Sequence, residues 1–457
     1  MQRVRIVGAG LAGSEAAWQL ARLGIPVELI DIKPGKMTPA HKKPYPAELV
    51  CSNSFKSDDP QTASGLLKRE MRQLDSIILA AADQTRVPAG SALAVDRDMF
   101  ARKVGAMLKA TGLIKYTERE ICSLEVDPDT VLLLATGPLT TDKLMSAMSE
   151  EWGELLHFFD AAAPIVSFDS LDSSHYFTAS RYDRGSADYL NCPLDHKTYL
   201  MFRSALIEAE KTEIREFDRK VFQNCQPIEI LAEKGEDTMR FGPLKPVGLI
   251  DPRTGKQPYA VLQLRREQST GEMYNLVGCQ TRMTFAAQRE VFGIVPALSQ
   301  AEYLRYGVMH RNHYVRGPEV LDIGNRTKTR QNLFLAGQIT GVEGYMESAA
   351  SGLITGRMIA LIAAGYPADR IGEIVLPPTT MMGALSAYVS GTDSKDFQPM
   401  NANFGIIQYD PDFITAKRKQ ERRAQLIAAS DLHLASWREC YQNLCKKYGI
   451  GYENGGL

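Results

Sequence analysis

The sequence predicts an α/β protein with two parts, a domain built on parallel strands and an α+β domain inserted into it. Three short apolar runs, at 4–7, 131–135 and 332–336, each lead into glycine, as buried parallel strands often do. Between the second and third runs, residues 165–315 have a different composition, rich in Tyr, Phe, Arg and Pro. Segments at 259–265 and 273–278 alternate partly between apolar and polar residues, which favours strands with one buried face.

The first apolar run opens a strand, turn, helix and strand unit. The turn reads Gly8, Ala9, Gly10, Leu11, Ala12 and Gly13, and the second strand ends at Asp31, 23 positions after Gly8. Gly8 permits the tight turn, Gly10 lets the backbone approach a pyrophosphate, and Gly13 lets the helix pack close to the strand. The helix N-terminus offers free N–H groups to phosphates, and Asp31 can accept hydrogen bonds from ribose hydroxyls. The unit predicts a dinucleotide site.

The two later runs indicate FAD rather than NAD. The run at 131–135 is followed by Gly137. The run at 332–336 is followed by Gly337, Gln338, Gly341, Gly344 and Tyr345, and then by a helix rich in alanine and glycine. A two-part FAD domain has an early strand for the ADP half and a late glycine strand that reaches the flavin, whereas NAD domains usually show only the first element. The sequence therefore predicts a Rossmann-like FAD-binding domain of the glutathione-reductase type, with three unrelated strands of one core as the alternative.

These features divide the chain into four segments. Residues 1–164 are the first part of the FAD-binding domain, and residues 316–445 are its second part, with C-terminal helices. Residues 165–315 are the inserted domain, which carries Cys225. Residues 446–457 end in a glycine-rich sequence and are expected to form a mobile tail.

The composition excludes several classes of protein. A chain of 457 residues with 44% apolar residues can bury a sizeable core. It has no run of about 18 apolar residues, and its N-terminus leads directly into a strand, so we expect a soluble cytoplasmic protein without membrane contact. Seven scattered cysteines do not match a secreted disulfide framework. We expect no metal site, and a monomer or a weak dimer.

Two cysteines lie where a thiol could act chemically. Cys51 lies among small polar residues in the long loop after the second strand. This loop starts beside the predicted dinucleotide site. Cys225 lies in the inserted domain, where Pro227 restricts Gln226 and favours a tight loop. A thiol is mostly protonated at neutral pH, so each needs nearby positive charge or a helix N-terminus to become a nucleophile. Taken alone, each also fits a buried structural thiol.

Any contact with RNA must come from local basic clusters, because the formal net charge is −1. The first cluster is a C-terminal stretch of helical composition, in which Lys417, Lys419 and Arg423 are the candidate RNA contacts. A second cluster, at 326–330, lies in a predicted turn. Solvated surface charge is the alternative explanation for both.

Seven separate blocks of the sequence resemble the folate- and FAD-dependent tRNA (uracil-C5) methyltransferases, and they cover nearly the whole chain. The blocks are VCSNS at 50–54, GLLKREM at 65–71, NCQPIE at 224–229, FGPLKPVGL at 241–249, RYGVMHRN at 305–312, AGQITGVEGYMESAASG at 336–352 and FQPMNANFG at 397–405.

The resemblance implies a reaction and roles for three residues. In this family NAD(P)H reduces the flavin, methylenetetrahydrofolate supplies the carbon, and the product is 5-methyluridine in the tRNA T-loop. Cys225 matches the cysteine that adds to uracil C6, and Cys51 matches the cysteine that removes the C5 proton or assists the flavin-side chemistry. Tyr345 matches an aromatic residue beside the flavin ring. The sequence leaves open which of the two thiols is the nucleophile, and whether NADH or NADPH is used.

Three other functions fit parts of this pattern. A folate- and FAD-dependent rRNA methyltransferase would share the flavin and cysteine motifs. A flavin oxidoreductase of a small metabolite would keep the FAD segments but would not need Cys225 or the basic C-terminal stretch. An RNA-binding protein that modifies a wobble uridine only with a partner would transfer no methyl group when purified alone.

Overall fold

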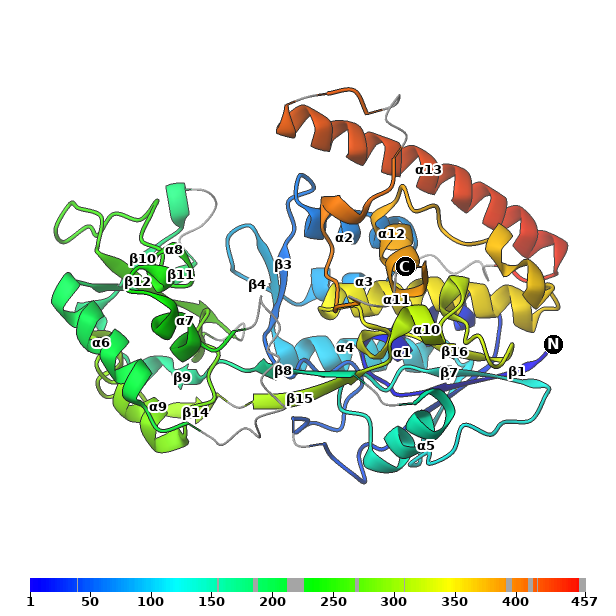
Figure 1. Ribbon diagram of the computed structural model, residues 1–457, viewed down its shortest axis with the longest axis horizontal. Helices are drawn as coiled ribbons and strands as arrows, with labels where there is room; N and C mark the ends of the chain where they lie inside the picture. Colours follow the sequence, from blue (N-terminus) through cyan, green and yellow to red (C-terminus); the bar gives the residue numbers. More distant parts are fainter. Residues whose placement is uncertain are drawn as a thin grey trace.

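The computed structural model describes residues 1–38, 40–153, 156–183, 188–211, 226–267, 271–307, 309–391, 397–409, 414–416 and 418–451. They form a larger domain and a smaller one side by side, connected by a two-stranded ribbon (Figure 1). The ribbon pairs β8 (Leu156–Ala161) with β15 (Met309–Tyr314) in antiparallel orientation. The chain therefore leaves the larger domain along one strand and returns along its partner.

A five-stranded parallel sheet is the centre of the larger domain, with strand order β16-β7-β1-β2-β6. Its strands are β1 (Arg3–Val7), β2 (Val27–Asp31), β6 (Ile114–Glu118), β7 (Thr130–Leu134) and β16 (Leu333–Leu335). Along β7, Val131 and Leu133 belong to the core on one face, and Leu132 and Leu134 belong to the core on the other. Because both faces are covered, the strand reads as an unbroken apolar run.

Helices cover the sheet on both sides (Figure 1). One side holds α1 (Leu11–Arg22), α2 (Ala63–Gln73), α3 (Ile77–Gln84), α4 (Arg97–Ala110), α11 (Tyr345–Ala363), α12 (Met381–Gly391) and α13 (Lys419–Lys447), and the other side holds α5 (Asp142–Trp152). The short helix α10 (Gly317–Val320) follows the ribbon. A small antiparallel sheet of β3 (Ser54–Ser57), β5 (Ala92–Val95) and β4 (Arg86–Val87) lies toward the smaller domain.

Helices α1 and α11 pack unusually close together. A Cβ on Gly352 would lie 2.1 Å from the Ala12 carbonyl oxygen, and one on Gly356 would lie 2.8 Å from Ala16 Cα. Small residues on both helices therefore let the two backbones touch. This contact joins the first and last parts of the domain, although more than 300 residues of sequence separate them.

The smaller domain has its own sheet and its own core. Its strand order is β10-β11-β12-β13-β9-β14, and its apolar core is separate from those of the larger domain. The strands are β9 (Ile165–Ser167), β10 (Phe177–Ala179), β11 (Tyr189–Leu194), β12 (Ala260–Arg266), β13 (Met273–Leu276) and β14 (Tyr303–Arg305). The helices are α6 (His196–Glu208), α7 (Ile228–Lys234), α8 (Thr238–Phe241) and α9 (Phe285–Phe292).

The predicted fold class is confirmed, since a parallel α/β sheet carries an inserted α+β domain. The segment boundaries stay predictions, and one of them differs from the observed helices. Helix α13 continues to Lys447, and the Ile450 side chain is buried, so residues 446–450 belong to the packed domain instead of the expected mobile tail. The rest of that segment, 452–457, lies outside the described residues. No helix in the described ranges is long and apolar enough to cross a membrane.

The close packing of α1 against α11 allows us to predict the effect of one added methyl group. Gly352→Ala forces two backbones apart, so we expect it to destabilise the larger domain by about 1–3 kcal/mol. The measurement is the thermal midpoint of unfolding. Gly372→Ala is the matched control, because a Cβ at that position meets nothing within 4 Å. Equal midpoints for the two variants would contradict close packing between α1 and α11.

Candidate active site

A deep cleft opens at the carboxyl ends of β1, β2, β7 and β16. Its empty volume, including the part open to solvent, is about 1100 Å³. The predicted site residues that line it are Gly8, Gly10, Leu11, Ala12, Asp31, Gly137, Gly337, Gln338 and Tyr345. The carboxyl edge of a parallel sheet is where such folds bind dinucleotides.

The glycine turn has the geometry that the sequence predicts. Gly8 has a φ of 101°, and a Cβ there would lie 2.4 Å from the Ala135 carbonyl oxygen. A Cβ on Gly13 would lie 1.8 Å from the Gly8 carbonyl oxygen. Gly10 differs, because a Cβ there would meet nothing within 4 Å, so its bare backbone faces open space in the cleft. Gly8 and Gly13 are thus needed for packing, whereas Gly10 leaves room for a ligand.

Asp31 is held in place by the backbone around the turn. Its carboxylate accepts hydrogen bonds from the Ala9 N–H at 2.6 Å and from the Lys33 N–H at 2.9 Å. Ala9 itself is fully buried and does not line the cleft. The carboxylate is therefore held in one orientation, and Asp31 lines the cleft.

Sequence reasoning missed a polar cluster at this end of the cleft. Lys33, Thr38, His41 and Glu48 all line it, and the His41 Nδ1 atom lies 2.6 Å from the Thr38 hydroxyl. Burial lowers the pKa of Lys33, and burial together with the charge of Lys33 lowers the pKa of His41. These residues belong to the irregular loop after β2, where no periodic pattern marks them.

The glycine positions after β16 divide into two groups. Gly337 and Gln338 border the cleft, with Gly337 at a φ of 84°. Gly341 and Gly344 do not line it. Gly341, at a φ of 97°, packs against the Phe397 ring, and Gly344 immediately precedes α11. The second group therefore shapes the turn without bordering the cleft.

Tyr345 connects the cleft to the loop of Cys51. Its hydroxyl oxygen accepts hydrogen bonds from the Cys51 N–H at 2.7 Å and from the Ser52 N–H at 3.2 Å. Burial and the neighbouring thiol of Cys51 raise the pKa of Tyr345, so the phenol stays neutral at neutral pH. The residue before Cys51, Val50, also lines the cleft. Cys51, which is half-buried, thus follows one residue that lines the cleft and is hydrogen-bonded through its N–H to another.

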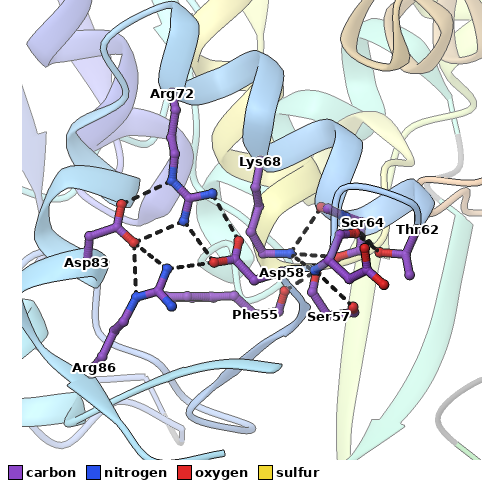
Figure 2. A network of polar contacts seen from close by, with 11 residues as sticks. Phe55, Ser57, Asp58, Thr62, Ser64, Lys68, Arg72, Asp83 and Arg86 are labelled. Atoms are coloured by element: carbon purple, nitrogen blue, oxygen red, sulfur yellow. Dashed lines mark hydrogen bonds and ion pairs between the residues drawn. The ribbon is translucent and has the colours of Figure 1, made fainter. Parts of the chain in front are cut away.

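A polar network supports the strand that follows the Cys51 loop. Figure 2 shows Asp58, just after β3, bound by Arg72 of α2 and by Arg86 of β4. The buried Lys68 ammonium donates to the Ser57 carbonyl at 2.6 Å and to the Ser64 hydroxyl at 2.7 Å, and burial lowers its pKa to about 8. The GLLKREM block thereby fixes the end of β3 to helix α2.

Cys225 lies outside the described residues, so its role as the cysteine that adds to uracil C6 stays a prediction. The chain resumes at Gln226, whose side-chain oxygen accepts a hydrogen bond from Lys234 at 2.6 Å. The buried Glu229 carboxylate accepts from the Thr281 hydroxyl at 3.0 Å and from the Arg282 N–H at 2.9 Å. The start of α7 is thereby fixed to the loop at 281–282.

The basic clusters have different surroundings. Lys417 and the Lys419 side chain lie outside the described residues, whereas the Arg423 guanidinium lies over the Phe404 ring at 5.3 Å. The cluster at 326–330 makes internal contacts: Arg330 forms an ion pair with Glu151 at 2.7 Å. Arg326 forms an ion pair with Asp322, and Lys328 donates a hydrogen bond to the Pro318 carbonyl. The second cluster is therefore structural.

Comparison with known proteins decides the family. The model of the family described as glucose inhibited division protein A matches residues 3–367. A relative from Acetivibrio thermocellus is 50% identical over 93% of this chain and 96% of its own, and one from Lactiplantibacillus plantarum is 48% identical over 94% and 96%. Both are named methylenetetrahydrofolate–tRNA-(uracil-5-)-methyltransferase TrmFO. The chain belongs to the TrmFO family. The resemblance seen in the sequence is confirmed.

Solved structures support the fold independently. GidA from Aquifex aeolicus is similar in two crystal forms, with TM-scores of 0.67 and 0.65. The matches cover 98% of this chain and 78% and 76% of the GidA chains, at 16% and 15% identity. At this level of identity the likeness concerns the fold alone.

The Tyr345 hydroxyl gives a prediction for the Cys51 loop. Tyr345→Phe removes the acceptor of two partly buried N–H groups, which costs about 1–3 kcal/mol. We expect faster amide hydrogen exchange in a peptide containing residues 50–53, measured by mass spectrometry. Tyr366→Phe is the control, because its hydroxyl contacts only its own loop at Arg370 and Glu373. Unchanged exchange in Tyr345→Phe would show that the hydroxyl does not hold the loop.

Proposed function

We propose that this chain methylates C5 of a uridine in tRNA and takes the carbon from methylenetetrahydrofolate. One observation carries the proposal: in a chain of the TrmFO family, Tyr345 joins the backbone of Cys51 to the border of a dinucleotide cleft. A thiol that can act on a pyrimidine is thereby next to a cleft that suits a redox cofactor. The T-loop is the proposed position of the uridine.

The cleft fits FAD. Gly10 and Gly137 both face open space in it, where a side chain would take the room of a ligand. We assign the pyrophosphate to the N-terminus of α1 and the ribose to Asp31, because free N–H groups and a carboxylate suit those groups. Gly337, Gln338 and Tyr345 then border the flavin end. Bound FAD supplies the reducing equivalents that bring a methylene carbon to the level of a methyl group, and NAD(P)H is the proposed source of those equivalents.

Two thiols carry the chemistry on the uracil. C5 of uracil is a poor nucleophile, and addition of a thiolate at C6 converts it into an enolate-like carbon that can accept the methylene unit. We assign this addition to Cys225. Removal of the C5 proton then lets the Cys225 thiolate leave and restores the C5–C6 double bond. We assign the proton to Cys51, which is half-buried and whose N–H binds Tyr345 at the wall of the cleft.

The direct test combines purified protein, unmodified tRNA, NAD(P)H and labelled methylenetetrahydrofolate, followed by mass spectrometry of the nucleosides. We expect 5-methyluridine in tRNA. The same assay with unmodified rRNA separates the two RNA classes. Label in rRNA alone, or no label with active flavin reduction, would overturn the proposal.

Cys225→Ala tests the nucleophile. We expect product formation to fall at least 1000-fold, because uracil C5 is no longer activated, while the protein keeps its yellow flavin. Cys192→Ala is the control, since this thiol is fully buried in the inserted domain. Full activity of Cys225→Ala would refute the assignment.

Cys51→Ala tests the proton acceptor. We expect turnover to fall by two to four orders of magnitude, in the range of a lost general base, with FAD retained. Addition of the RNA to Cys225 should persist, so a covalent complex with tRNA should accumulate in a denaturing gel. Turnover equal to that of the parent protein would exclude a direct role for this thiol.

A further inference from the structure

The loop that carries Cys51 is held by arginine side chains at five successive residues, 49–53. Arg305 donates to the Val50 carbonyl, and Arg97 donates to the Cys51 carbonyl at 3.3 Å. Arg265 donates to the Ser52 hydroxyl at 2.8 Å and to the Asn53 side-chain oxygen at 3.1 Å. Arg97 also reaches back to the Leu49 carbonyl at 3.1 Å. The backbone around the thiol is therefore fixed from several directions.

These arginines come from both domains. Arg97 is the first residue of α4 in the larger domain, whereas Arg265 lies in β12 and Arg305 in β14 of the inserted domain. The Asn53 side chain returns a hydrogen bond to the Arg266 carbonyl at 2.9 Å. The Cys51 loop is thus one place where the inserted domain contacts the FAD-binding domain. A second contact joins the Tyr189 hydroxyl of β11 to the Ala89 carbonyl.

The charges that act on Cys51 have opposite signs and come from separate elements. Arg97 and Arg305 both interact electrostatically with the thiol, and so does the Tyr345 phenol. The buried carboxylate of Glu267 forms an ion pair with Arg97 at 2.6 Å and also acts on Arg305. At neutral pH these groups carry two positive charges, on Arg97 and Arg305, and one negative charge, on Glu267. The net positive charge favours a thiolate over a thiol.

The pKa shifts agree with this arrangement. Burial lowers the pKa of Arg97, but Glu267, with smaller contributions from Tyr345 and Cys51, outweighs burial and the pKa is raised. Burial and the charge of Arg97 lower the pKa of Arg305. Glu267 is therefore the group that allows two guanidinium groups to lie near one thiol.

We propose that Arg97, Arg265 and Arg305 are positioning residues for Cys51, and that Glu267 sets how much of the positive charge of Arg97 and Arg305 the thiol experiences. The catalytic use of Cys51 rests on the proposed function, whereas the contacts themselves do not. Contact with the inserted domain then brings Arg265 and Arg305 to the loop and favours the thiolate of Cys51, which is the form that can accept a proton.

The test measures the reactivity of Cys51 without any substrate. The flavin-bound protein is treated with iodoacetamide between pH 6 and 10, and mass spectrometry follows alkylation of the peptide that contains Cys51. Arg97→Gln removes one positive charge, so we expect the pH midpoint of alkylation to rise by about one unit, with about tenfold slower alkylation below the midpoint.

Two further variants separate charge from structural damage. Glu267→Gln leaves the arginine charges without their carboxylate, so we expect the midpoint to fall, opposite in sign to Arg97→Gln. Arg97→Lys keeps the charge and should restore the midpoint at least partly. Local unfolding would move Arg97→Gln and Glu267→Gln in the same direction, and that outcome would overturn the proposal. Should Arg97→Gln not fold, the Glu267→Gln and Arg97→Lys profiles decide by themselves.

Arg330→Gln is the matched control. Arg330 also pairs with a carboxylate, Glu151, and donates to a backbone carbonyl, that of Leu124 at 3.0 Å. We expect its alkylation profile to coincide with that of the parent protein. A profile for Arg97→Gln that coincides too would refute the proposal. A shifted profile in a protein that makes no 5-methyluridine would refute the proposed function and leave the positioning role intact.

Discussion

The architecture depends on the contact between α1 and α11. Helix α11 has no room for a side chain at Gly352, which meets Ala12, or at Gly356, which meets Ala16. This closeness brings the two ends of the FAD-binding domain together. The α1 end contributes the glycine turn, and the α11 end contributes Gly337 and Tyr345, so the cleft is complete only when both are present. A packing constraint between two helices thereby places groups on either side of one ligand site.

The contact between the two domains at the Cys51 loop is chemically different. The core of the inserted domain is separate from those of the larger domain, and the loop contacts are guanidinium groups on carbonyl and hydroxyl oxygens. Polar interfaces of this kind allow relative domain motion more readily than large apolar ones. Such an interface suits a protein that must admit both a folded RNA and a folate beside a bound flavin.

The sequence predicted what short-range geometry decides. Gly8, Gly10, Gly13 and Asp31 lie in one unit of about 25 residues, and turn chemistry and periodicity suffice to place them. Tyr345 and Cys51 are 294 positions apart, so the strand motifs related each of them to the dinucleotide site but could not predict the hydrogen bond between them. No pattern in the sequence distinguished Arg97, because one arginine at the start of a helix looks like any other.

Long-range pairing also explains the expectations that changed. The cluster at 326–330 has the composition of a solvated turn, but Arg330 forms an ion pair with Glu151, which is 179 positions away. The segment after 446 ends in glycines, yet Ile450 packs into the core beside α13. Arg330 pairs with the distant Glu151, and the ring of Tyr448, just before Ile450, lies 5.5 Å from that of Tyr366, so local composition carries no information about either contact.

The order of the strands in the central sheet has a consequence for biosynthesis. β16 is the edge strand beside β7, and the helix that follows it covers α1. A ribosome therefore releases the whole inserted domain, with its independent core, before the last strand of the nucleotide-binding sheet exists. Until then Ala12 and Ala16 present an uncovered apolar surface. The nascent chain must shield that surface for the time needed to translate roughly 300 residues, on the order of 15–60 s at ribosomal elongation rates.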